Sequence, residues 1–222
     1  MKNSPDAKTP QTTQVKEAYE DMLVRLAITA EYKDPGAGGH IRRVSDYTTV
    51  IARLVGLGEE EVETLRYASM MHDIGKIGIP DIILEKSTSL TAEERKKMEE
   101  HTIIGSRIFE GSASPIVIAS AQIALTHHEK YDGTGYPKGL KGEDIPLYGR
   151  IVSIADYFDA FVSERLYKKA WSFDDALLDI EKKAGSSFDP KIVSIFLDAK
   201  KTLRQILDAN NAIADFVKNG KS

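Results

Sequence analysis

The sequence HHEKYDGTGYP at residues 127–137 places two consecutive histidines directly before an irregular, glycine-rich segment. Neighbouring side chains on a regular helix point about 100° apart, so His127 and His128 can serve one site only at a helix end or in a distorted turn. The mostly apolar run 115–126 before the pair is typical of a buried helix. We therefore predict a helix that ends on this pair, followed by a long loop over 129–150 of the kind that usually carries function.

The other histidines of the chain extend this pattern in both directions. All five histidines and two aspartates form one ordered series, which runs His40, His72, Asp73, His101, His127, His128 and Asp156. Successive groups are separated by about one helix plus its connection, so each group is expected on its own helix. Imidazole and carboxylate ligands without cysteine suit iron, manganese, nickel or zinc in a nitrogen and oxygen environment. The series therefore predicts a metal site.

Helical periodicity dominates the rest of the chain. After His40, apolar residues recur with the spacing of one buried helix face, and Thr91 followed by Glu94 has the pattern of a helix-starting capping box. The expected helices lie near 13–33, 40–57, 59–71, 115–126, 173–184 and 190–218, with two more after Thr91 and from Ile151. Because no segment alternates over strand length, we predict an all-α fold.

The chain is long enough for one large domain with appended helices. We divide it into a flexible tail or linker (1–12), an N-terminal helix (13–33), a main domain (34–200) and a C-terminal helix (201–222). The N-terminal helix repeats apolar residues at Val15, Tyr19, Met22 and Leu26. We favour packing of this stripe on the domain's own core. The alternative is a signalling helix that pairs with its twin in a homodimer.

Composition excludes several classes of partner. The net charge of −4 and the pI of about 5.8 give no concentrated basic surface for duplex nucleic acid, although a small anionic substrate needs only a few local cations. The chain has no cysteine for disulfides, no apolar leader segment and no apolar run of transmembrane length. We expect a cytoplasmic protein without membrane insertion.

Taken together, the motifs resemble the HD-GYP domain, a branch of the HD phosphohydrolase superfamily. The resemblance covers roughly residues 20–200 and rests on HDIGK at 72–76, IPD at 79–81, HHEKYDGTGYP at 127–137, IPL at 145–147, DYFDA at 156–160 and FDP at 188–190. It implies an HD-domain helical bundle with a long Gly/Pro-rich (GYP) loop beside a dinuclear metal site.

The resemblance also implies an activity. Such a protein would be a metal-dependent phosphodiesterase that hydrolyses cyclic di-GMP to linear pGpG in bacterial second-messenger signalling, with further hydrolysis to GMP left open. Two alternatives remain at this point. The substrate could be another cyclic dinucleotide or nucleotide, or the domain could be a catalytically quiet module that docks partners through the GYP loop.

The metal ligands follow from the same resemblance. Asp73 would bridge two divalent ions, because a carboxylate has two oxygens. The first ion would be completed by His40, His72 and Asp156, and the second by His101, His127 and His128. Iron is the first choice and manganese the next. A third metal is not expected, because Gly36 stands where some members of the family carry a liganding glutamate.

Further residues are assigned to catalysis and to binding. Beside Asp73, Lys76 would act on the scissile phosphate or the leaving group. Arg165 and Lys168 would hold the substrate's phosphates. The loop residues Gly135, Tyr136 and Pro137 would shape the pocket, with Tyr136 or Tyr131 stacking on guanine. The same loop could also bind a diguanylate cyclase (GGDEF-type) domain, and the two roles do not exclude each other.

Overall fold

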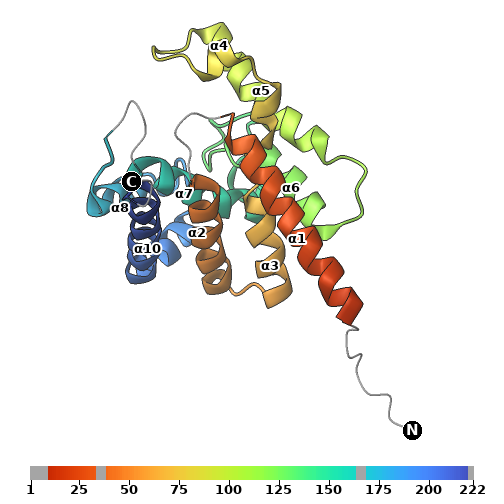
Figure 1. The fold of residues 1–222 in the computed structure, drawn as a ribbon. Helices are drawn as coiled ribbons and strands as arrows, with labels where there is room; N and C mark the ends of the chain where they lie inside the picture. Colours follow the sequence, from red (N-terminus) through yellow and green to blue (C-terminus); the bar gives the residue numbers. More distant parts are fainter. Residues whose placement is uncertain (1–9, 34–38, 164–168, 220–222) are drawn as a thin grey trace.

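A computed structural model describes residues 10–33, 39–163 and 169–219 of the 222-residue chain. Within these ranges the fold is helical, without a strand, as predicted (Figure 1). The elements are α1 (Pro10–Glu31), α2 (His40–Val55), α3 (Glu59–Ser69), η1 (Ile74–Gly78), α4 (Asp81–Leu84), α5 (Ala92–Ile108), α6 (Pro115–Thr126), η2 (Gly142–Asp144), α7 (Leu147–Val162), α8 (Phe173–Lys182), α9 (Pro190–Asp198) and α10 (Lys200–Asn219).

Local sequence signals explain where several helices begin and end. Thr91 accepts a hydrogen bond from the Glu94 backbone N–H, and the Glu94 carboxylate accepts one from the Thr91 N–H, so the predicted capping box starts α5. Pro115 begins α6, where its missing N–H leaves no helical hydrogen bond unmade. Gly56 ends α2 in a left-handed conformation with φ 93°. The starts of α5 and α6 agree with the prediction, whereas α2 ends at Val55, two residues before the predicted end.

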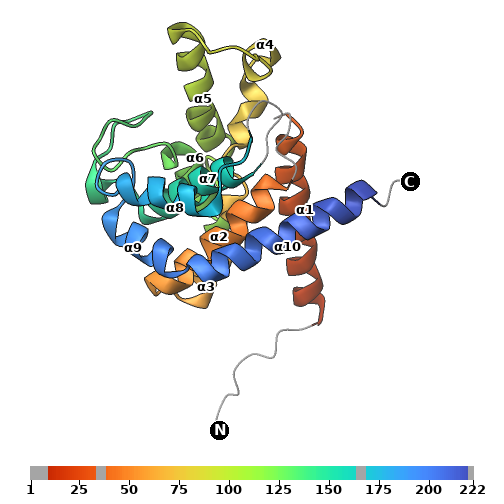
Figure 2. The same ribbon diagram turned by 90° about the vertical axis from the view of Figure 1, so that its left-hand side faces the viewer.

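The main core lies between α2, α3, α6 and α7, and α8, α9 and α10 cover its other side. Its centre is aromatic: Phe158 packs edge-on against Tyr47 at 5.1 Å and against Phe196 at 5.1 Å between ring centroids. The predicted inward face of α2 is buried, including Val44 and Ile51. Figure 2 shows α10 running across α2, which closes this side of the bundle.

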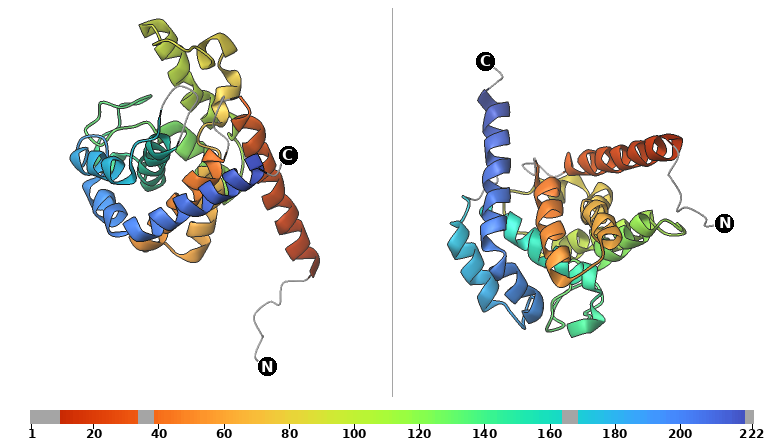
Figure 3. Two further views of the ribbon diagram at one scale, coloured as in Figure 1. Left: turned by 60° about the vertical axis from the view of Figure 1, so that its left-hand side comes forward. Right: turned by 90° about the horizontal axis from the view of Figure 1, so that it is seen from below.

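The favoured prediction for the stripe on α1 is wrong. Val15 is 65% exposed and Met22 is 70% exposed, and Tyr19 and Leu26 are exposed as well. The helix instead docks through Leu23 and Ala27, which are buried against residues of α3, η1 and the end of α5. Figure 3 shows α1 at the periphery of the bundle. Most of the apolar stripe therefore faces away from the domain's own core, although the Tyr19 hydroxyl contacts the Ser114 hydroxyl at 3.1 Å.

Some helix boundaries also differ from the prediction. Helix α3 ends at Ser69, before the predicted Met71, because the chain tightens there into turns and the 3₁₀-helix η1. The predicted helix 190–218 is two helices separated at Ala199. Helix α7 begins at Leu147, four residues before the predicted start. Among the described residues, no helix is long and apolar enough to cross a membrane.

Candidate metal centre

The seven predicted ligands converge on one place in the bundle. They come from the first residue of α2, the turn between α3 and η1, the middle of α5, the end of α6 and the middle of α7. Their ligand atoms form two groups, each within 4.8 Å: Asp73, His101, His127 and His128 in one, and His40, His72 and Asp156 in the other. The histidines and Asp156 divide between the two groups as the resemblance implies, with Asp73 grouped with the second set, and each group could hold a metal ion.

The histidine pair is accommodated as the sequence requires. Helix α6 ends at Thr126, and the chain turns at His127 and His128, whose ring centroids lie 4.0 Å apart. Both rings therefore reach the same group, although they are neighbours in the chain.

Backbone carbonyls fix the orientation of three of the imidazole rings. The Nδ1–H groups of His72, His101 and His127 donate to carbonyl oxygens one helical turn earlier, at 2.8, 2.7 and 3.0 Å. A carbonyl oxygen can only accept, so Nδ1 carries a proton and Nε2 is the nitrogen left to bind a metal ion. In each case Nε2 points into the centre, which is the arrangement of a metal-binding histidine.

His40 is oriented by a carboxylate instead. Its Nδ1 lies 2.7 Å from Oδ2 of Asp159, a buried residue of α7. Arg43, one turn beyond His40 on α2, donates to both oxygens of the same carboxylate at 2.6 and 3.0 Å. Sequence reasoning noted Asp159 only as part of a motif and missed Arg43. The available signal was the three-residue spacing of Asp156 and Asp159, which puts both on one helix face.

Asp73 lies between the two groups. Its Oδ1 is 3.3 Å from His101 Nε2 and 3.6 Å from His127 Nε2, while its Oδ2 is 3.4 Å from His72 Nε2. Oδ1 is buried and makes no hydrogen bond in the structure. Electron-rich atoms crowded in this way repel one another unless a cation lies among them. The donor set therefore fits divalent metal ions, with Asp73 facing both groups.

The charges around the centre support this fit. Burial lowers the pKa of His40, but the carboxylates of Asp156 and Asp159 outweigh burial and raise it to about 9. Burial also raises the pKa of Asp73, but Lys76 and the neighbouring histidines outweigh it and hold that pKa well below the usual range. On the other side of the centre, burial lowers the pKa of His101 to about 4. The side of the site around His40 therefore attracts positive charge. The side around His101 offers a neutral nitrogen donor.

The close approach of η1 to α5 depends on Gly75. A β-carbon at this position would lie 1.9 Å from the carbonyl oxygen of His101 and 2.5 Å from the amide nitrogen of Gly105. Only glycine fits between these backbones. Without this contact Asp73 could not lie beside His101.

Lys76 extends into the centre from η1. Its Nζ lies 2.7 Å from Oδ2 of Asp73, and its side chain is 17% exposed. It is therefore part of the centre and is not a solvated surface lysine.

The glycine-rich loop folds back onto the ligands. Buried Glu129 accepts hydrogen bonds from the backbone N–H groups of Lys138 and Leu140 at 2.7 and 2.9 Å, which closes the loop. This role was missed, and the signal was a charged residue directly after two ligands. The Tyr136 ring packs 4.8 Å from the ring of His128, and its peptide bond to Pro137 is cis. The loop therefore forms one wall of the centre.

Several predicted residues lie outside the described part of the chain. These are Arg165 and Lys168, the proposed phosphate ligands, and Gly36, on which the prediction of two metals depends. Their assignments stay predictions.

Comparison with known proteins agrees with this geometry. A sequence model of the HD domain family matches residues 26–192. The chain is 44% identical over 193 residues to the cyclic di-GMP phosphodiesterase response regulator RpfG of Xanthomonas campestris, covering 87% of this chain and 51% of that protein. It is 39% identical over 184 residues to 3'3'-cGAMP-specific phosphodiesterase 2 of Vibrio cholerae, covering 83% of this chain and 35% of that one.

Among solved structures, the fold is similar to that of Bd1817, an HDG"Y"P protein from Bdellovibrio bacteriovorus. The TM-score is 0.58 at 20% sequence identity, with 73% of this chain and 51% of that chain covered. At this identity the likeness concerns the fold.

Proposed function

Because the chain belongs to the HD domain family, in its HD-GYP branch, we propose that it is a metal-dependent phosphodiesterase that hydrolyses cyclic di-GMP to linear pGpG. The observation that carries the proposal is the position of Asp73, whose two oxygens face two separate groups of histidine ligands. Two divalent ions held there, iron first and manganese next, would supply charge neutralisation at the phosphate and a nucleophilic water near neutral pH.

The protein's own residues would hold the ions and bind the substrate. The histidines would hold the ions, and the carbonyls and Asp159 that bind Nδ1 would keep the rings of His40, His72, His101 and His127 in place. Lys76 brings a positive charge to the edge of the centre, where it would contact the scissile phosphate or protonate the leaving oxygen. Tyr136 would form the pocket wall, with Gly135 and Pro137 setting its position, and Arg165 and Lys168 would bind the phosphates.

The test is reconstitution without oxygen in the presence of iron or manganese, followed by metal quantification and chromatography of the products from cyclic di-GMP. We expect two metals per chain and accumulation of pGpG. The double variant His72→Ala, Asp73→Ala should lose both metal and turnover, because it removes one ligand of the first group and the shared carboxylate. Turnover by that variant would contradict the mechanism, and a third bound metal would contradict the inference from Gly36.

A second substrate is supported by one observation, the 39% identity to a relative named as specific for 3'3'-cGAMP. The same reconstituted protein should therefore be offered cyclic di-GMP and 3'3'-cGAMP side by side. Faster hydrolysis of 3'3'-cGAMP would keep the chemistry and change the substrate.

Two partners belong to the same proposal. The outer side of the GYP loop, where Lys130, Lys138 and Lys141 are exposed, would bind a diguanylate cyclase domain. The exposed stripe on α1 would pair with the same stripe of a second copy. A cytoplasmic location, where the nucleotide is found, completes the proposal.

A further inference from the structure

Three exposed apolar side chains lie in the turn after α1, in η1 and in α4, and the functions assigned so far do not use them. They belong to Tyr32, Ile77 and Ile82, which are 87%, 53% and 82% exposed. Tyr32 and Ile82 are the two most exposed large apolar side chains among the residues that the structure describes. We call these three residues the rim.

Contacts on both sides of Tyr32 join the rim to the metal centre. Before it, Glu31 accepts a hydrogen bond at 3.2 Å from the backbone N–H of Ile41, the residue after His40. After it, Lys33 forms an ion pair at 2.5 Å with Asp81, the residue before Ile82. The end of α1 is therefore attached both to the start of α2 and to the segment that follows η1.

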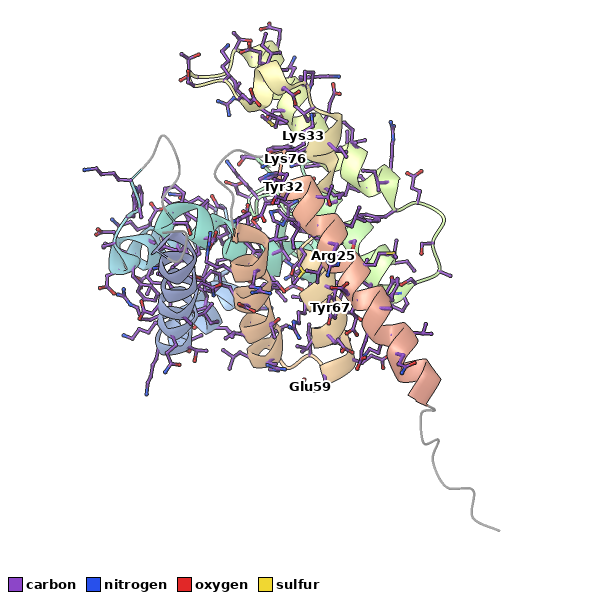
Figure 4. The ribbon with its side chains drawn as sticks, viewed as in Figure 1. Arg25, Tyr32, Lys33, Glu59, Tyr67 and Lys76 are labelled. Atoms are coloured by element: carbon purple, nitrogen blue, oxygen red, sulfur yellow. The ribbon has the colours of Figure 1, made fainter. Side chains whose placement is uncertain are left out.

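A cavity of about 20 Å³ lies between the end of α1 and the reacting groups. It is lined by Glu31 from the end of α1 together with His40, Asp73 and Lys76. Ile77 follows Lys76 directly in the chain. Figure 4 shows Tyr32, Lys33 and Lys76 at the same end of α1. The residues directly before Tyr32 and Ile77 therefore border the same cavity as His40 and Asp73.

We propose that the rim is the subsite for a purine base of the substrate, with the Tyr32 ring as the stacking surface. This rests on the proposed function, since it presupposes a nucleotide whose phosphate lies at the metal centre.

The chemistry of the rim fits a base. Single exposed apolar residues are ordinary on a protein surface, but here Tyr32 and Ile77 directly follow two residues of the same cavity, Glu31 and Lys76. Purines have two flat faces that stack on aromatic rings. Packing does not account for Tyr32, because an 87% exposed side chain contributes little to the core.

The test compares two inhibitors that differ only in the base. Hydrolysis of bis(p-nitrophenyl) phosphate by the metal-reconstituted protein reports on the centre, and GMP or ribose 5-phosphate is added as a competitor. In Tyr32→Ala we expect the inhibition constant of GMP to rise about tenfold, the usual size for one lost stacking contact, while that of ribose 5-phosphate stays the same. Tyr32→Phe keeps the ring face and should behave like the unaltered protein.

Leu54→Ala is the matched control. Leu54 is 54% exposed on the last turn of α2, about 21 Å along the helix from His40. This variant should change neither inhibition constant. Because these constants do not depend on the active fraction, partial misfolding of a variant does not alter the comparison.

Equal changes for GMP and ribose 5-phosphate, or no change for either, would overturn the base subsite. Failure of the proposed substrate is distinguishable, because the unaltered protein would then leave cyclic di-GMP intact while GMP still competes better than ribose 5-phosphate.

Discussion

Lys76 brings its charge to within 2.7 Å of Asp73, although only 17% of its side chain is exposed. If it acts on the phosphate or the leaving group, its removal should slow the chemical step without emptying the centre. We therefore expect Lys76→Met to retain two metals per chain while kcat falls about 100-fold or more, the range for a lost acid or charge contact. Metal quantification and initial rates on the same sample measure both.

The control for this prediction is Lys86→Met. Lys86 also forms a partly buried ion pair, with Glu94 in the cap of α5, but it is not a residue of the metal centre. This variant should keep its rate. An unchanged kcat in Lys76→Met would assign Lys76 a purely electrostatic role in holding Asp73.

Asp159 should act through His40, since its carboxylate accepts the Nδ1 proton and is itself held by Arg43. In Asp159→Asn the ring loses its charged partner, and we expect metal affinity to fall about 10- to 100-fold. Competition with a chelator of known affinity measures this directly. Loss of a buried charge also destabilises the fold, so the comparison needs a variant with that defect alone.

The variant Asp189→Asn loses a buried charge without touching the metal centre. Asp189 is as buried as Asp159 and forms an ion pair at 2.5 Å with Arg150, outside the metal centre. Both variants should unfold at lower temperature, because each leaves an arginine without its buried partner. Only Asp159→Asn should bind metal more weakly. Equal metal affinities in the two variants would show that Asp159 serves stability alone.

At the scale of elements, the metal centre depends on how closely η1 lies against α5. Gly75→Ala would place a β-carbon 1.9 Å from a backbone oxygen, so one element must move. We expect a loss of about 1–3 kcal/mol in the free energy of unfolding, together with weaker metal binding because Asp73 moves with η1. Chemical denaturation and chelator competition measure the two effects.

Gly58→Ala is the comparison for this change. A β-carbon there meets only the Glu61 carboxylate, at 3.9 Å, and Gly58 lies at the start of α3, away from the centre. The loss of its cap geometry should cost less than about 1 kcal/mol and leave metal affinity unchanged. Normal metal binding in Gly75→Ala would mean that the two elements can separate without disturbing the site.

The elements also show what the sequence could predict. The starts of α2, α5 and α6 were predicted correctly because glycine, a capping box and a proline mark them locally. The buried face of α1 was predicted wrongly because Met22 and Leu23 are neighbours and both are apolar. Polar contacts on the docking side, such as Tyr67 to Glu20 at 2.9 Å, help to hold α1 there, and apolar periodicity does not record them.

The sequence likewise predicted some residues of the candidate site and missed others. Its histidines were found because the chain has only five and their order is regular. The contact between Asp159 and Arg43 was missed because these residues are 116 positions apart in the sequence, and the local spacing of Asp156 and Asp159 does not identify the partner on α2. Glu129 was missed because its partners are backbone N–H groups, which carry no residue signature.

At the scale of the whole molecule, α1 connects the surface to the metal centre. One side of this helix docks on the domain, and its last turn touches the start of α2 beside His40 through Glu31. Its other side carries the exposed apolar stripe. Pairing with a second copy would cover that stripe, and it would also fix the helix whose end borders the catalytic groups.

The stripe therefore predicts a weak homodimer. Its positions alternate by four and three residues over two heptads, the spacing of a coiled-coil seam, and two heptads give limited stability. A charge at the most exposed position should oppose pairing, so we expect Met22→Glu to raise the dimer dissociation constant at least about tenfold, or about 1.4 kcal/mol. Sedimentation velocity over a range of concentrations measures this dissociation constant.

Leu54→Glu adds the same charge to an exposed apolar position on α2 and should leave the dimer intact. A chain that stays monomeric at every concentration, or a dimer that Met22→Glu leaves unchanged, would rule out this seam.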